Sequence, residues 1–147
     1  MYTEGLSNDE IKNAFMFNVS NPQNFIDSIV KEAEDAVNKG YRELTLLGQN
    51  VNSYIHDNYK FHDLLKKISQ ISGVDRIRYT SPHPQDISDQ LLEVMRKYDN
   101  ICNYIHLPLQ AGSDRILRRM HRSYSKTDFL NLVKKIRQML PNVGIST

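Results

Sequence analysis

The chain has 147 residues, of which 39% are hydrophobic and 24% charged, with a mean hydropathy of −0.55. This composition is typical of a soluble globular protein, and the length predicts one domain. A complete eight-fold β/α barrel is excluded, because it needs roughly 250 residues. No apolar run reaches the roughly 18 residues of a membrane-spanning helix, and no secretory leader opens the chain, so we expect a cytoplasmic protein without membrane contact.

Cysteine and charge narrow the possible functions further. The only cysteine is Cys102, which excludes an internal disulfide and a self-contained multi-cysteine metal or iron–sulfur site. The net charge is +2, but residues 1–60 hold five Lys/Arg and nine Asp/Glu, whereas residues 61–147 hold fourteen and eight. The densest basic stretch consists of Arg115, Arg118, Arg119, Arg122 and Lys126. It predicts either a surface for nucleic acid or another polyanion, or a solvated helix face.

The first regular pattern begins at Asn21. Residues 1–20 show only weak helical spacing, and we expect an arm or a weak helix there. Asn21 is a suitable N-cap and Pro22 a suitable first helical residue, and the apolar residues from Phe25 to Val37 recur with helical spacing. We therefore expect residues 21–147 to form the domain.

Strands and helices then alternate along the chain. The patterns predict strands at 41–47, 75–80, 103–107 and 143–147, with helices at 61–71, 88–95, 114–120 and 125–140. Such an α/β series predicts a parallel sheet with right-handed crossovers. Two architectures fit, an open doubly wound sheet and a partial β/α (TIM-like) barrel with about four parallel strands. The end of the chain inside an apparent strand favours a truncated barrel.

Three polar loops follow the first three strands. They span Gly48–Tyr54, Ser81–Asp86 and Pro108–Asp114. In both architectures ligands bind at the carboxyl ends of the strands. Amide side chains there offer paired donors and acceptors for an amino acid carboxylate, a ribose or a base edge, and His83 is the one group that titrates near neutrality. The set predicts binding and positioning rather than hydrolysis, although each loop also has a purely structural interpretation.

Four ordered motifs carry a resemblance to a known family. They are Leu46–Tyr54, Arg76–Pro84, His106–Asp114 and Met120–Tyr124, and Gly144–Thr147 is similar to the start of a further strand. In this order they resemble the strand motifs of radical SAM methylthiotransferases that modify tRNA. The branch that acts on dimethylallyl-adenosine beside the anticodon is the most similar. The resemblance covers residues 21–147 and implies the middle of a radical SAM domain, which is a partial β/α barrel.

The resemblance also implies cofactors and a partner. Family members use S-adenosyl-L-methionine (SAM) and a 4Fe–4S cluster held by the three thiolates of a CxxxCxxC motif, and they act on tRNA. That motif is absent here, so we expect this chain to be a fragment that is inactive alone, holds no metal and associates through exposed sheet edges. Two alternatives stay open: a non-catalytic βα module for a nucleoside or RNA, and a flavodoxin-like domain.

Site residues follow from the matched strand ends, and none is assigned a catalytic role. The resemblance implies that SAM is contacted from three loops and one arginine. The candidate residues are Gln49 and Asn50 at the amino acid portion of SAM, Ser81 and His83 in the same cavity, Gln110 and Ser113 near the ribose and methionine parts, and Arg122. The Arg122 guanidinium suits either the SAM carboxylate or an RNA phosphate.

Overall fold

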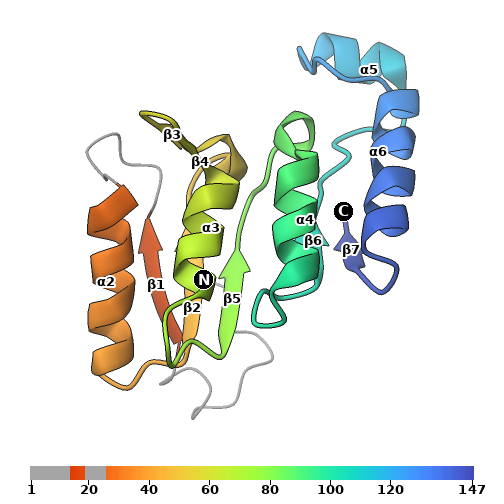
Figure 1. Cartoon of the computed structure of the whole chain (residues 1–147). Helices are drawn as coiled ribbons and strands as arrows, with labels where there is room; N and C mark the ends of the chain where they lie inside the picture. Colours follow the sequence, from red (N-terminus) through yellow and green to blue (C-terminus); the bar gives the residue numbers. More distant parts are fainter. Residues whose placement is uncertain (1–13, 19–25) are drawn as a thin grey trace.

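The computed structural model describes residues 14–18 and 26–147, in which strands and helices alternate (Figure 1). The strands are β1 (Ala14–Asn18), β2 (Glu43–Leu47), β3 (Ile55–His56), β4 (Tyr59–Lys60), β5 (Arg76–Tyr79), β6 (Tyr104–His106) and β7 (Gly144–Ser146). The helices are α2 (Ile26–Asn38), α3 (Phe61–Ser69), α4 (Asp89–Lys97), α5 (Asp114–Arg119) and α6 (Lys126–Met139), with short 3-10 turns η1 (Val51–Ser53) and η2 (Pro84–Asp86).

The longer strands are parallel and lie in chain order. One sheet has the order β1-β2-β5, and β6 pairs with β7. An isolated bridge joins β5 to Ile101, which precedes β6: the Ile77 N–H donates to the Asn100 carbonyl at 2.7 Å and the Cys102 N–H donates to the Ile77 carbonyl at 2.9 Å. A doubly wound sheet needs a reversal of strand order. The described strands show none.

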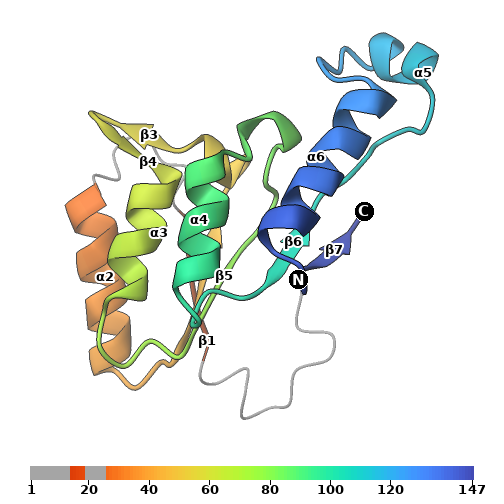
Figure 2. The same cartoon turned by 45° about the vertical axis from the view of Figure 1, so that its right-hand side comes forward.

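Helices α2, α3 and α4 cover one face of the three-stranded sheet (Figures 1 and 2). Side chains alternate between the faces of a strand. Leu44, Leu46 and Ile77 are fully buried and belong to the same core as helix residues such as Leu64 and Leu92. The residues that alternate with them therefore lie on the opposite face. None of the described helices is long and apolar enough to cross a lipid bilayer.

Several helix starts agree with the sequence patterns. The Ser88 Oγ accepts a hydrogen bond from the Leu91 N–H at 3.1 Å and caps α4. At α6, the Ser125 Oγ accepts from the Asp128 N–H and the Asp128 carboxylate accepts from the Ser125 N–H, so the predicted capping box is confirmed. The predicted alternation of helices with parallel strands is likewise confirmed.

Two local predictions differ from the structure. Residues 14–18, expected in an arm or weak helix, form strand β1 beside β2, while the remainder of residues 1–20 and the Asn21 cap lie outside the described residues. Strand β1 forms by pairing with β2, about thirty positions away along the chain, and sequence periodicity does not reveal such a partner. The β3–β4 hairpin was not predicted, because its strands have two residues each and are mostly exposed.

Candidate functional site at the strand ends

The three predicted loops share an unusual backbone conformation. Asn50 after β2, Ser81 after β5 and Gln110 after β6 have positive φ angles of 50°, 54° and 70°. For a residue other than glycine this left-handed conformation costs roughly 1–2 kcal/mol. Such strain collects at functional sites when the surrounding structure enforces it. All three residues are among those predicted to bind SAM.

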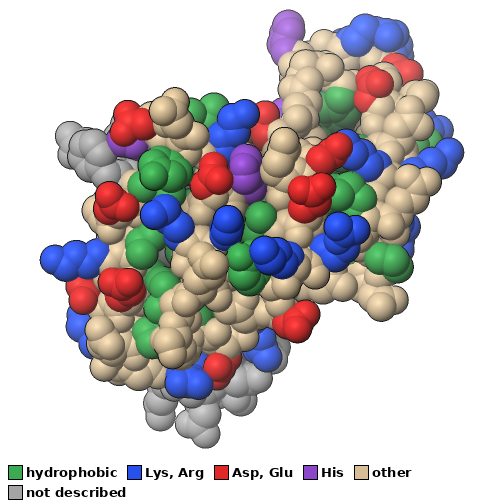
Figure 3. All heavy atoms as spheres, viewed as in Figure 1, with side chains coloured by type: hydrophobic (Ala, Val, Ile, Leu, Met, Phe, Trp, Pro, Cys, Tyr) green, Lys and Arg blue, Asp and Glu red, His purple; other side chains and the backbone are tan. Residues whose placement is uncertain are grey.

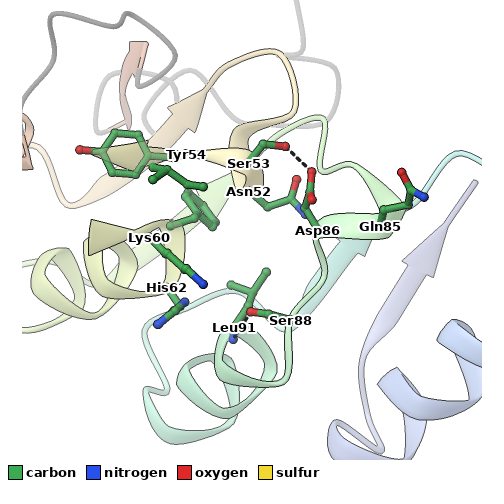
Figure 4. Close-up of a pocket in the computed structure, with 11 residues that line it drawn as sticks. Asn52, Ser53, Tyr54, Lys60, His62, Gln85, Asp86, Ser88 and Leu91 are labelled. Carbon is green, nitrogen blue, oxygen red and sulfur yellow. Dashed lines mark hydrogen bonds between the residues drawn. The ribbon is translucent and has the colours of Figure 1, made fainter. Parts of the chain in front are cut away.

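Asn52 connects the loop after β2 to the loop after β5. Its Nδ2 donates to the His83 carbonyl at 2.9 Å, and its Oδ1 accepts from the His83 N–H at 2.6 Å. The Asn52 residue is only 7% exposed. The adjacent Ser53 hydroxyl donates to the Asp86 carboxylate, as Figure 4 shows. These bonds fix the two loops relative to each other.

A second set of bonds connects the remaining loops. The Ser123 Oγ donates to Gln85 Oε1 at 2.7 Å, which joins the α5–α6 loop to the loop after β5. The Tyr124 hydroxyl donates to the Leu109 carbonyl at 3.2 Å, and the Leu109 N–H donates to Thr147 Oγ1 at 2.8 Å. The loops after β2, β5 and β6 are therefore connected at one end of the parallel strands.

The structure brings the predicted loops together, although other side chains make the connections. Gln49, Asn50, Ser81, Gln110 and Ser113 are exposed. Their assignment to SAM stays a prediction.

The other two predicted residues are half-buried. The His83 Nδ1 accepts a hydrogen bond from the Gln85 N–H at 3.3 Å, so it caps the start of η2. The Arg122 Nε is buried and has no hydrogen-bond partner among the described residues. An unpaired buried donor costs free energy, so Arg122 has unused capacity to bind an acceptor.

Sequence reasoning missed the residues that join the loops. Asn52 and Ser53 lie inside the first resembling motif, and Gln85 and Asp86 follow the second, yet none was selected as a site residue. The one available signal was the position of Asn52 beside the apolar Val51. Both residues are buried in the structure. Burial of the polar Asn52 side chain requires an internal hydrogen-bond partner.

The face of the sheet away from the helices carries charged and polar side chains on β2 and β5, beside the exposed Met16 of β1. The Glu43 carboxylate on β2 pairs with Arg76 and Arg78 on β5 at 2.9 and 2.7 Å. On the second sheet, Ser146 Oγ lies 2.7 Å from His106 Nδ1 and 2.5 Å from the Tyr104 hydroxyl. A solvated or ligand-lined surface fits this set of side chains better than an apolar core does.

A pocket of about 290 Å³ lies between the loops after β2 and β5 and the starts of α3 and α4 (Figure 4). Its polar lining includes Asn52, Ser53, Lys60, His62, Asp86 and Ser88. None of the seven residues predicted to bind SAM lines it. The pocket is therefore distinct from the predicted SAM site.

The family model of the Radical SAM superfamily matches residues 18–147. The chain belongs to the radical SAM superfamily. The tRNA-2-methylthio-N(6)-dimethylallyladenosine synthase of Clostridium novyi (strain NT) is 48% identical over 129 residues, which are 86% of this chain and 28% of that protein. The enzyme of the same name from Helicobacter pylori (strain G27) is 50% identical over 128 residues, 83% of this chain and 29% of its own length. The resemblance seen in the motifs is confirmed, and this radical SAM chain spans less than a third of these relatives.

The radical SAM family implies SAM and a 4Fe–4S cluster, and the residues of this chain fit the two groups differently. The amide and hydroxyl groups of the strand-end loops match the polar atoms of SAM in chemistry. The cluster needs three thiolates, whereas the chain has only Cys102, whose thiol pKa is raised by burial. The described residues also contain no group of three His, Cys, Asp or Glu side chains placed to hold a metal. These residues do not fit a cluster.

Proposed function

We propose that this chain is part of a radical SAM methylthiotransferase that acts on dimethylallyl-adenosine in tRNA, in the cytoplasm. The names of the relatives support the substrate, and their greater length supports a contribution from further residues. The chain alone lacks activity in this proposal, because it cannot hold the cluster. Its strand-end loops form one wall of the SAM site.

The same proposal assigns the fold to a partial β/α barrel. Parallel strands in chain order with helices on one face are what a barrel wall requires. The polar face that carries Glu43, Arg76 and Arg78 then lines the interior. A complete barrel packs this interior with apolar side chains. A polar lining instead leaves room for a cofactor and substrate.

The proposed role of each loop is to bind and orient SAM, while the cluster and SAM supply the radical chemistry when both are bound. Gln49 and Asn50 hold the amino acid portion, and Gln110 and Ser113 hold the ribose and methionine parts. Ser81 and His83 line the same cavity from the loop after β5. Arg122 neutralises the SAM carboxylate or an RNA phosphate.

One observation supports this proposal most strongly: three strand ends each place a strained residue in loops that are joined to one another. A loop that served only as a turn would be more stable with glycine at a positive φ. Asn50, Ser81 and Gln110 instead keep side chains that can bind a polar ligand.

The test compares glycine substitutions at positive φ. Gln110→Gly should stabilise the fold by about 0.5–1 kcal/mol, because relief of the roughly 1–2 kcal/mol of left-handed strain outweighs the entropic cost of glycine, and should weaken SAM binding at least threefold. Asp57→Gly is the matched control, since Asp57 has φ 51° in the β3–β4 hairpin. It should leave the SAM affinity unchanged. Saturation-transfer NMR can measure the weak SAM binding that we expect of this chain, with guanosine as the negative probe.

The outcome that contradicts the SAM site is equal affinity for SAM in the wild-type chain and Gln110→Gly. Sub-micromolar binding of SAM would contradict a different part of the proposal, namely that further residues complete the site. The alternative of a non-catalytic nucleoside or RNA module predicts that adenosine binds as tightly as SAM, because that module needs no contact with the methionine part.

A further inference from the structure

We infer that α5 and the loop after it form a docking surface for backbone phosphates of RNA, a role that rests on the proposed function. The surface, called the α5 basic face, is defined by Arg115, Arg118, Arg119 and Arg122. All four lie within or directly after the six-residue helix Asp114–Arg119. Figure 3 shows Lys and Arg side chains at this end of the molecule, at the upper right.

The helix geometry places three of these arginines side by side. Residues three and four apart share one face of a helix, so Arg115, Arg118 and Arg119 form one stripe. All three are exposed, whereas Leu117, which points to the other side of the helix, is 1% exposed. Leu117 therefore anchors the helix, and the arginine stripe faces solvent.

The arginines of the α5 basic face have no carboxylate partner in the described part of the chain. By contrast, Arg42, Arg76 and Arg78 pair with Asp75 or Glu43. The nearest acidic residues along the chain are engaged elsewhere. The Asp114 Oδ1 accepts from the Lys126 N–H at 2.7 Å, and Asp128 is held by Ser125. The four arginine side chains therefore form no ion pair among the described residues and are available to an external anion.

A purely structural role does not account for this stripe. Arg118 and Arg119 lie in the last turn, where cations interact well with the helix dipole, but Arg115 lies in the first turns, where they do not. Like charges three and four residues apart also destabilise a helix. A polyanion that binds the stripe would remove this repulsion.

The position of the surface relates it to the proposed SAM site. The α5–α6 loop is joined to the loop after β5 through Ser123 and Gln85. Figure 1 shows α5 at the end toward which the arrows of β1 and β5 point. The half-buried Arg122, with its unpartnered Nε, lies in the α5–α6 loop directly before Ser123. RNA on the α5 basic face would therefore extend toward the strand ends.

RNA fits this surface better than an acidic protein does. Arginine forks bind phosphates in two-point geometry, and a nucleic-acid backbone offers a regular row of them. An acidic protein would also need apolar contacts, and the one large hydrophobic residue classed as exposed within or directly after α5 is Met120, at 42%. The α5 basic face therefore suits the phosphate backbone of a nucleic acid.

The test measures binding of a fluorescent anticodon stem–loop RNA to the full chain by anisotropy at several salt concentrations. Arg118→Gln/Arg119→Gln should weaken binding by about five- to twentyfold and lower the slope of log affinity against log salt by about 1.4–1.8. Arg96→Gln/Arg137→Gln removes the same charge from exposed positions on α4 and α6 and should change the affinity less than twofold. Glutamine favours helix formation, so circular dichroism should show unchanged folds.

Three results would overturn the inference: no RNA binding by the wild-type chain at low salt, equal losses in the two double variants, or polyglutamate that competes as well as RNA at equal charge. SAM binding, measured on the same proteins, reports separately on the proposed function. Arg118→Gln/Arg119→Gln should leave it unchanged, because neither residue is assigned to SAM. If SAM fails to bind while RNA binding depends on these arginines, the result supports the docking surface and contradicts the proposed SAM site.

Discussion

Asn52 and His83 share two hydrogen bonds of opposite direction, one donated and one accepted by the Asn52 amide. Because both His83 backbone groups lose their partner, we expect Asn52→Ala to destabilise the fold by about 1–3 kcal/mol. Urea unfolding followed by circular dichroism measures this loss. Asn131→Ala on the exposed side of α6 is the control and should stay within about 0.5 kcal/mol. Similar losses in both variants would show that the Asn52 bonds contribute little.

Glu43 should be the most sensitive acidic residue of the sheet. Glu43→Gln leaves Arg76 and Arg78 side by side without their shared countercharge. Removing one partner of a buried pair costs 3–5 kcal/mol, and the partial exposure of both arginines reduces our expectation to about 1–2 kcal/mol. Asp75→Asn, which breaks the exposed pair with Arg42, should cost clearly less. Chemical unfolding measures the free energy of unfolding of both variants. A larger loss for Asp75→Asn than for Glu43→Gln would contradict the ranking.

The α6 capping box should make stability depend on acidity. Hydrogen bonds from the Ser125 hydroxyl and N–H lower the Asp128 pKa below its ordinary value. A carboxyl whose pKa is lower in the folded state stabilises the fold above its unfolded pKa and loses this effect as the pH falls. We expect Asp128→Asn to lower the unfolding temperature at pH 6 and to reduce its decline below about pH 4. Parallel pH profiles for the wild type and Asp128→Asn would contradict the mechanism.

Iron–sulfur reconstitution of this chain should fail. Anaerobic treatment with iron and sulfide should give neither the visible absorption of a 4Fe–4S cluster nor stoichiometric protein-bound iron, because Cys102 is the only thiol. Cys102→Ser is the control for adventitious iron and should give the same spectrum as the wild type. A stoichiometric cluster in the wild type that Cys102→Ser abolishes would mean that clusters form between chains.

The chain should associate at high concentration. Among the described strands, β7 pairs only with β6 and β1 only with β2, which leaves unpaired strand edges. Such edges pair with other chains. Sedimentation velocity should show species larger than a monomer that increase with protein concentration. A single monomeric species at every concentration would refute this expectation.

Local patterns predicted most of the fold. The apolar spacing of α3 and α6 and the caps at Ser88 and Ser125 depend on residues a few positions apart, so the sequence carries that information directly. Strand β1 was missed because it forms by pairing with β2, about thirty positions away. Sequence periodicity does not encode a distant partner.

The candidate site could be located from the sequence but not assembled. The polar residues after each strand were expected to meet at one end of the sheet, and the structure joins these loops there, since parallel strands place their carboxyl ends together. The connections from Asn52 to His83 and from Ser123 to Gln85 join residues 31 and 38 positions apart. The positive φ angles of Ser81 and Gln110 were also hidden, because neither residue type favours that conformation.

The register of the strands has a consequence for biosynthesis. Ala14 lies opposite Glu43, Glu43 opposite Arg76, and Tyr104 opposite Gly144, so β2, β5 and β7 each pair with a strand that has already been made. A nascent chain leaving the ribosome can therefore add these three strands to an existing edge, without holding a gap open within either sheet. Translation and folding can therefore proceed together, one strand–helix unit at a time.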